Sequence, residues 1–304
     1  MNALKRLIIT HRTTYRYAER VSFGPHRMML RPRDSHEMRL ISATLTTSLP
    51  ADYAWTYDVF GNEVCTGHFS GQASELEIES RLEIDRFPSA VPTHFLSGRE
   101  TPFPIVYSAD EAIDLGATML TSAETYPDDL RVWIAGLPRR YSGGAMDLLT
   151  GLCQEIHGTF TYETRFEQST QDPALTFRNR SGACRDFAAL FIACARLLGF
   201  GARFVSGYLF DPIPENGEPA MQGAGASHAW ADVYLPDTGW VEFDPTNGLV
   251  ASDRLIRIAV VREPHQALPI SGSFVGTPSA FVGLWVGVDV EQVLEGRELE
   301  VAPA

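Results

Sequence analysis

The stretch "SGACRDFAALFIACARLLGF", residues 181–200, places a single cysteine between Ser-Gly-Ala and a long run of apolar residues. These apolar residues recur at the spacing of one helix face, which predicts a helix that begins near Cys184. The stripe consists of Phe187, Leu190, Phe191, Cys194, Leu197 and Leu198. Cys184 lies three residues before Phe187, so it either extends the stripe into the core or lies at the helix N-terminus as a nucleophile. The rest of the chain has to decide between these two interpretations.

The composition indicates a globular protein without a nucleic-acid partner. The chain has 304 residues, of which 44% are hydrophobic and 21% charged, and this length favours two domains. Its net charge of −13 lacks the basic face that nucleic acid requires. Cys153 and His157 lie four residues apart, but no second pair completes a zinc site. With no calcium-loop motif either, we expect neither a metal nor another cofactor.

The N-terminal sequence "MNALKRLIIT" has only a short apolar run behind Lys5 and Arg6. A signal peptide has a longer apolar core, and no run elsewhere in the chain reaches membrane-spanning length. We therefore expect a cytoplasmic protein that has no membrane partner.

The first part of the chain, residues 1–90, reads as β-strands. Residues 73–85 alternate apolar and charged side chains, which is typical of a strand with one buried face. Residues 53–69 form two strand-like runs around Gly61-Asn62, a pair that suits a hairpin turn. Residues 6–17 and 36–49 add two candidate strands. The pattern predicts an antiparallel β-sandwich.

The second part, residues 91–304, follows a proline-rich linker at 88–104 and begins with helical patterns. Ser108 and Glu111 have the spacing of a capping box, and a further helix is predicted over 144–157. Strand-like runs follow the helix that begins at Cys184, so we expect an α+β fold with an antiparallel sheet. Residues 275–290 also read as a strand and could pack back on the N-terminal domain.

Two further words of the sequence separate Cys184 from the other cysteines. "GASHAWADVYL" places His228 at the start of a strand after a glycine-rich loop, and "GWVEFDPTNG" ends a strand at Asp244. A thiol nucleophile needs a neighbouring base, and that base needs an acceptor that fixes its tautomer. Cys184, His228 and Asp244 supply these three roles. The predicted helix N-terminus also favours a thiolate at Cys184.

These words resemble the bacterial transglutaminase-like superfamily over residues 182–248, and "VSFGPHRMMLRPR" with "DVFGN" resembles the β-rich N-terminal region of one of its branches. The resemblance implies a papain-like core in which Cys184 is the nucleophile, His228 the base and Asp244 the orienting acid. We expect Asp244 to accept the Nδ1–H of His228, which leaves Nε2 to face the Cys184 sulfur. Residues 211–227 are interpreted as a flap that leads to His228.

Four neighbouring residues are weaker candidates for substrate or oxyanion contacts. Asn179 could supply a side-chain oxyanion donor beside the Cys184 backbone N–H. Arg185 could contact substrate or pair with Asp186. Tyr208 could donate a hydrogen bond near the cleft, and Trp230 could either pack in the core or form a wall of the substrate groove.

The sequence therefore predicts a thiol enzyme that acts on an amide or peptide bond through an acyl-enzyme at Cys184. With water as acceptor it is a protease or amidase, which we favour; with an amine it is a protein-glutamine transglutaminase. The alternative from another class is a non-catalytic peptide-binding module on the same fold. The expected partner is a peptide or protein substrate, and the oligomeric state is not indicated.

Overall fold

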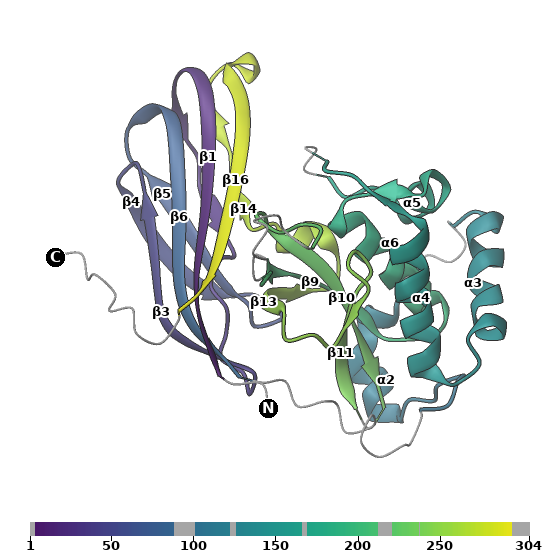
Figure 1. The fold of residues 1–304 in the computed structure, drawn as a ribbon. Helices are drawn as coiled ribbons and strands as arrows, with labels where there is room; N and C mark the ends of the chain where they lie inside the picture. The colour runs from purple at the N-terminus through teal and green to yellow at the C-terminus, as the bar shows by residue number, and fades with distance from the viewer. Residues whose placement is uncertain are drawn as a thin grey trace, which may run out of the picture.

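The computed structural model describes residues 4–87, 101–121, 126–165, 169–211, 221–236 and 238–293. Its N-terminal part contains two antiparallel sheets that face each other as a sandwich (Figure 1). The first sheet comprises β1 (Lys5–Phe23), β3 (Met38–Thr47), β6 (Gln72–Arg86), β15 (Phe274–Val275) and β16 (Phe281–Gln292). The second comprises β2 (His26–Met28), β4 (Ala51–Tyr57), β5 (Glu63–Phe69) and β14 (Ile270–Ser271).

The strands predicted from alternation are confirmed in this sandwich. Residues 73–85 lie within β6, whose buried side chains Leu76, Ile78, Leu82 and Ile84 share one face. β4 and β5 form the predicted hairpin, and Gly61 in its turn has a φ of 76°, a backbone conformation that favours glycine. The fold class is therefore as the sequence predicts.

The sandwich is built from both ends of the chain. β16 pairs with β1 in antiparallel register from Leu7 opposite Gln292 to Tyr17 opposite Phe281, so the yellow C-terminal strand lies beside the purple N-terminal strand (Figure 1). This strand contains most of the segment 275–290 that reads as a strand in the sequence. The division of the chain at residue 90 stays a prediction.

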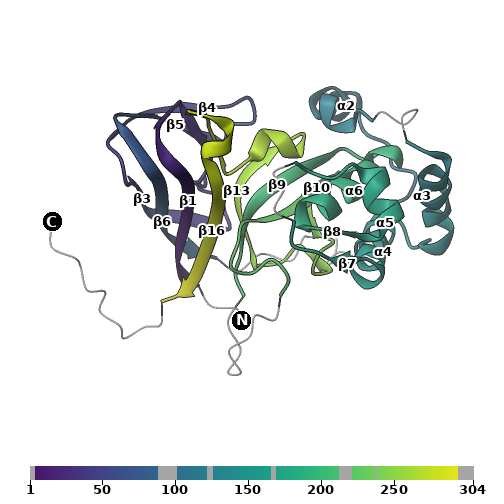
Figure 2. The same cartoon turned by 90° about the horizontal axis from the view of Figure 1, so that it is seen from above.

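The second part of the chain forms one antiparallel sheet covered by helices. The sheet has the order β12-β11-β10-β9-β13, with β9 (Ala202–Leu209), β10 (His228–Leu235), β11 (Gly239–Asp244), β12 (Leu249–Val250) and β13 (Leu255–Val261). The helices are α2 (Ala109–Leu115), α3 (Asp128–Arg140), α4 (Ala145–Thr159), α5 (Pro173–Asn179) and α6 (Cys184–Leu197). Viewed from above, this sheet lies between the sandwich and the helices (Figure 2). The short strands β7 (Thr161–Tyr162) and β8 (Ser181–Gly182) pair in parallel just before α6.

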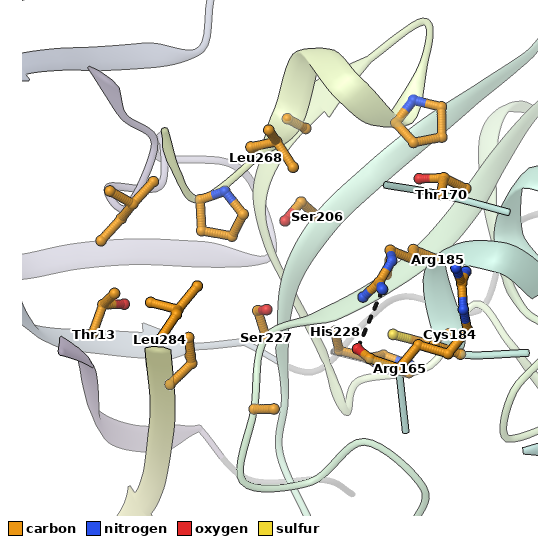
Figure 3. A pocket seen from close by; sticks show the side chains of 18 of the residues that line it. Thr13, Arg165, Thr170, Cys184, Arg185, Ser206, Ser227, His228, Leu268 and Leu284 are labelled. Atoms are coloured by element: carbon orange, nitrogen blue, oxygen red, sulfur yellow. Dashed lines mark hydrogen bonds between the residues drawn. The ribbon is translucent and has the colours of Figure 1, made fainter. Parts of the chain in front are cut away.

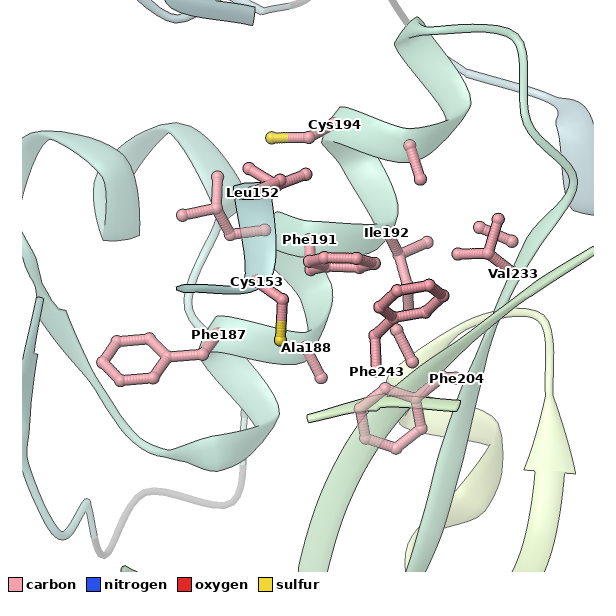
Figure 4. Close-up of a cluster of buried hydrophobic side chains, with 14 of the residues drawn as sticks. Leu152, Cys153, Phe187, Ala188, Phe191, Ile192, Cys194, Phe204, Val233 and Phe243 are labelled. Atoms are coloured by element: carbon pink, nitrogen blue, oxygen red, sulfur yellow. The ribbon is translucent and has the colours of Figure 1, made fainter. Parts of the chain in front are cut away.

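Helix α6 lies at the centre of this second part. Every residue from Asp186 to Arg196 is buried, because the helix packs against β9 and β10 on one side and α4 and α5 on the other. Phe191 stacks on Phe243 of β11 with ring centroids 5.2 Å apart, and Leu152 of α4 belongs to the same cluster (Figure 4). The sequence predicts a single apolar stripe on this helix. The structure instead buries α6 on all sides, and such a helix carries apolar residues around its whole circumference.

The inner face of β1 is shared between two partners. Leu7 and Ile9, near its start, pack against Tyr208 and Ile256 of the core sheet. Residues from Tyr15 onward pack instead against the second sheet of the sandwich. The sandwich and the core sheet therefore share a hydrophobic cluster, and the inner face of β1 changes partner between Ile9 and Tyr15.

Polar contacts also join the sandwich to the core sheet. The Asn62 side chain donates to the Val260 carbonyl at 2.7 Å and accepts from the Val260 N–H at 2.9 Å. Arg86, at the end of β6, donates to the Leu255 carbonyl at 3.3 Å. Because these backbone groups belong to β13, the sandwich packs along the edge strand of the core sheet.

The predicted helix starts are also confirmed. Ser108 caps α2, and Glu111 returns a hydrogen bond to the Ser108 N–H, which completes the capping box. The helix predicted over 144–157 is α4. Most of the proline-rich linker and most of the flap lie outside the described residues, at 88–100 and 212–220. Among the helices that the structure describes, none is both long and apolar enough to cross a bilayer.

Candidate active site

Cys184 is the first residue of α6. The N–H groups of the first helical turn have no acceptor inside the helix and carry the positive end of its dipole, so they favour a negative charge at this point. The residue before the helix, Ala183, has no side chain that could cap it. Asp186 takes this role and accepts the Ala183 N–H at 2.9 Å. Cys184 is largely buried, and its side chain borders a cavity.

Asp186 also anchors the chain segment beside Cys184. Its fully buried carboxylate accepts two hydrogen bonds from the Arg165 guanidinium, both at 2.8 Å, and one from the Gln171 N–H at 2.7 Å. Gly182 permits this arrangement, because a Cβ at that position would lie 2.9 Å from the Asp186 Cβ. The carboxylate therefore holds the ends of the 165–171 segment against the start of α6.

His228 and Asp244 lie on neighbouring strands and form a buried pair. The His228 Nε2–H donates to Asp244 Oδ2 at 2.8 Å, and both side chains are fully inaccessible to solvent. Burial alone would lower the pKa of His228, but the Asp244 charge and hydrogen bond, together with the Cys184 thiol, raise it to about 10. Burial opposes ionisation of Asp244 as well, yet His228 and its other donors keep the pKa of this carboxyl below its usual range.

The assignment of the two ring nitrogens in the sequence analysis was wrong, because Nε2 and not Nδ1 contacts Asp244. The strand register explains the difference. Ala231 pairs with Phe243, so Asp244 lies level with Trp230 and only diagonally across from His228. Diagonal neighbours on a sheet are about 7–8 Å apart, a distance that the outer nitrogen spans better than the inner one. Nδ1 is therefore the nitrogen left for Cys184.

The surroundings of Nδ1 are closed by the loop before β10. Nδ1 is buried and has no hydrogen-bond partner within the described part of the chain. Gly223 lies against it: a Cβ there would be 2.8 Å from Nδ1, and its φ of 85° also favours glycine. Cys184 also interacts with the imidazole and adds to the rise in its pKa that Asp244 causes, and Nδ1 is the ring nitrogen that Asp244 leaves unoccupied.

Asn247 is a supporting residue that the sequence analysis missed. Its side-chain amide donates to Asp244 Oδ2 at 2.9 Å and to the Gln222 carbonyl at 3.2 Å, and its Oδ1 accepts the Gln222 N–H at 2.9 Å. The Thr246 N–H donates to the other Asp244 oxygen at 2.9 Å. Asn247 thus ties the loop that leads to His228 to the carboxylate that orients it. The sequence signal that could have indicated this role is the position of Asn247 in "DPTNG", three residues after Asp244.

Cys184 and His228 border a cavity of about 380 Å³. Figure 3 shows Cys184, His228, Arg185 and Arg165 on one side of it, Thr13 and Leu284 on the opposite side, and Ser206 and Ser227 between them. The opposite wall comes from β1 and β16 of the sandwich. The candidate site therefore lies between the two parts of the chain, which the sequence analysis did not anticipate.

The four weaker candidates lie in different places. Arg185 borders the cavity and donates to the Arg165 carbonyl at 3.3 Å (Figure 3). Asn179 is exposed at the end of α5 and is not one of the described residues that line the cavity. Tyr208 is buried behind the cavity and contacts His11 Nδ1 at 3.0 Å. Trp230 is fully buried against the His228 ring, with centroids 6.1 Å apart, so it packs behind the site and forms no groove wall.

The other cysteines are core residues. Burial raises the pKa of Cys65 to about 11 and raises the pKa of Cys153 and Cys194 further. His157, four residues after Cys153, contacts the Thr246 carbonyl through Nδ1 at 2.8 Å and so supports the turn after Asp244. Cys153 thus packs in the core, and His157 stabilises the turn after Asp244.

The helix that begins at Cys184 thus packs on an antiparallel sheet that carries His228 and Asp244. Two family models match the chain: the "Bacterial transglutaminase-like N-terminal region" over residues 7–85 and the "Transglutaminase-like superfamily" over residues 137–245. The chain belongs to the transglutaminase-like superfamily, whose members are in general cysteine-dependent enzymes.

Three relatives illustrate this membership. An uncharacterized protein of Mycobacterium tuberculosis is 31% identical over 95% of this chain and 94% of its own. A protein-glutamine gamma-glutamyltransferase of Pseudomonas aeruginosa is 29% identical over 33% of this chain and 15% of its own. The crystal structure of "a Putative Cysteine Protease from Cytophaga hutchinsonii" superposes with a TM-score of 0.70 over 99% of this chain and 94% of that one, at 17% identity. At this identity the structural likeness concerns the fold.

Proposed function

We propose that the protein is a thiol enzyme that cleaves an amide or peptide bond through an acyl-enzyme at Cys184. The observation that carries the proposal is the buried 2.8 Å contact between His228 Nε2 and Asp244, which leaves Nδ1 of the same ring to Cys184. A base fixed in one tautomer beside a thiol is the arrangement that activates a nucleophile. Among the cysteines, Cys184 alone has such a neighbour in the part of the chain that the structure describes.

The reaction follows from these positions. The Cys184 proton moves to Nδ1, and the thiolate sulfur attacks the substrate carbonyl carbon, whose π electrons move to oxygen. The Cys184 backbone N–H, at the first turn of α6, donates to that oxyanion. When the C–N bond breaks, the leaving amine takes the proton from Nδ1 and a thioester remains. Asp244 accepts the Nε2–H throughout and stabilises the imidazolium.

The acceptor decides the name of the reaction. Water, deprotonated by Nδ1, hydrolyses the thioester and makes the protein a protease or amidase; an amine makes it a transglutaminase. A lysine or other alkylammonium acceptor is best bound by a carboxylate, and the described residues that line the cavity include neither Asp nor Glu. This lining supports hydrolysis.

A peptide-binding module without catalysis is the rival from another class. Such a module does not need a buried ion pair next to a thiol, and desolvating two charges is costly unless they serve a purpose. The intact set of Cys184, His228 and Asp244 therefore supports an enzyme.

The test is intact-mass spectrometry and peptide sequencing after incubation with a peptide library, with and without putrescine. We expect new peptide termini or deamidated products that require Cys184. Cys184→Ala should abolish them, whereas Cys194→Ala, on the same helix but in the core, should retain them in any variant that stays folded. Products that survive in Cys184→Ala would contradict the proposal. If the products are peptides joined to putrescine, the reaction is amine transfer and not hydrolysis.

A further inference from the structure

The end of the cavity opposite Cys184 is formed by the sandwich. Thr13 and Tyr15 of β1 and Leu284 and Val286 of β16 line it, and Figure 3 shows Thr13 and Leu284 across the cavity from Cys184. Thr13 pairs with Val286 and Tyr15 with Leu284, so these four side chains form one patch on the inner face of two neighbouring strands. We call these four residues the sandwich wall.

The sandwich wall lies where the inner face of the first sheet changes partner. Val288 packs with the core sheet, and Leu284 packs inside the sandwich. Val286 lies between them on the same face of β16 but belongs to neither cluster and is 41% exposed. An apolar side chain on an otherwise covered face is thus left open toward the cavity that contains Cys184.

The wall carries no charge that could pair with a charged ligand. No Asp, Glu, Lys or Arg of the described ranges contributes to it, and Arg165 and Arg185 line the other end of the cavity. His11, next to the wall, is held neutral because burial lowers its pKa to about 4, and its two ring nitrogens contact Tyr208 and Thr13. A lysine or glutamate side chain here would lose its hydration without a partner.

The wall is also tied to the loop that carries His228. The Val288 N–H of β16 donates to the Gly225 carbonyl at 3.0 Å, three residues before His228. This single backbone hydrogen bond joins the strand of the wall, two residues after Val286, to the loop that leads to His228. It therefore holds the wall and the imidazole at a defined separation. A substrate held at the wall would have a defined position relative to the base.

We propose that the sandwich wall is a specificity subsite that accepts an apolar side chain of the peptide substrate, at a residue close to the scissile amide. The proposal rests on the proposed function, because the occupant is the substrate of Cys184. A cavity of about 380 Å³ lies at the small end of the range for ligand pockets, so it accommodates a short stretch of extended peptide. The β-sandwich thereby contributes to substrate choice as well as to stability.

The experiment uses alkylating peptides and the full-length protein. Acetyl-tripeptidyl chloromethyl ketones place their residues on the acyl side of Cys184, and chloroacetyl-tripeptides place them on the leaving-group side. Each position is Leu, Lys, Glu or Gly in turn, and the rate of Cys184 alkylation is followed by intact mass. At one position in one series we expect Leu to react at least about tenfold faster than the other three, since apolar pockets discriminate by about 10–200-fold.

Two variants assign that preference to the wall. Val286→Glu should lose the preference for Leu and favour Lys at the same position by about tenfold. Val282→Glu is the matched control: Val282 lies on the same strand, is 61% exposed and does not line the cavity, so its profile should equal that of the wild type. Flat profiles in both series, or a Leu preference that Val286→Glu leaves unchanged, would overturn the inference.

Iodoacetamide separates this inference from the proposed function. It is too small to reach the wall, so it reports the reactivity of Cys184 alone. Rapid alkylation by iodoacetamide combined with flat peptide profiles would refute the subsite and leave the thiol enzyme standing. A Cys184 that resists both iodoacetamide and the peptides would refute the proposed function, and with it the subsite.

Discussion

His228 Nε2 lies 2.8 Å from Asp244 Oδ2 in a site that solvent does not reach, and Cys184 interacts with the same ring, whose other nitrogen has no partner among the described residues. Nε2 is therefore the nitrogen that binds Asp244, and Nδ1 is the nitrogen left for the thiol. Because burial would otherwise leave the imidazole neutral, its raised pKa depends on the carboxylate. This dependence makes Asp244 the residue whose replacement is most informative.

The stability of the protein should fall as the pH rises from about 6.5 to about 10. The native state holds the His228 proton up to a pKa of about 10, whereas an unfolded histidine loses it near 6.5. The stabilisation is complete below pH 6.5 and is lost as the pH approaches 10, with a limiting slope of about 1.4 kcal/mol per pH unit. Urea unfolding at several pH values measures this slope. Asp244→Asn is the control, and an equal slope in both proteins would contradict the prediction.

Asp186→Asn should destabilise the protein by about 3–5 kcal/mol, because it leaves the Arg165 guanidinium without its buried carboxylate. Asp129→Asn breaks an exposed contact with Arg178 and should cost far less stability, because solvent screens the pair. Chemical denaturation of the two variants measures both values. Equal losses in the two variants would mean that Asp186 does not anchor the segment beside Cys184.

Tyr208→Phe should cost about 1–3 kcal/mol, because it removes the hydroxyl that contacts buried His11 Nδ1. The rate of Cys184 alkylation by iodoacetamide should stay unchanged, since Tyr208 lies behind the cavity. A double-mutant cycle with His11→Ala should give a coupling free energy above about 0.5 kcal/mol. A large loss of alkylation rate at unchanged stability would instead make Tyr208 part of the reacting site.

Local patterns in the sequence carry much of the fold and the three residues of the candidate site. Alternation over 73–85 marks β6, the Ser108–Glu111 spacing marks the start of α2, and the words around Cys184, His228 and Asp244 mark the ends of α6, β10 and β11. Each of these signals lies within about a dozen residues of chain. Such features depend on local backbone and capping chemistry, which sequence periodicity records.

Features that depend on long-range pairing were not predictable. The contact of Nε2 with Asp244 follows from the register of β10 with β11, and the cavity wall follows from the pairing of Thr13 with Val286. Neither register leaves a mark in the local sequence, because strand pairing depends on which faces are buried in the assembled fold. Asn179 was proposed from its closeness to Cys184 along the chain, but α5 ends with its side chain exposed.

The most direct test of the account is the pH dependence of Cys184 alkylation by iodoacetamide between pH 5 and 9, compared in wild type and Asp244→Asn. We predict a profile that depends only weakly on pH in the wild type, because His228 stays protonated up to a pKa of about 10 and a positive ring beside Cys184 favours the reactive form of its thiol. In Asp244→Asn the rate should climb with pH like that of an isolated thiol and be at least about tenfold slower at pH 6. A wild-type rate that climbs tenfold per pH unit and coincides with that of Asp244→Asn would contradict the account.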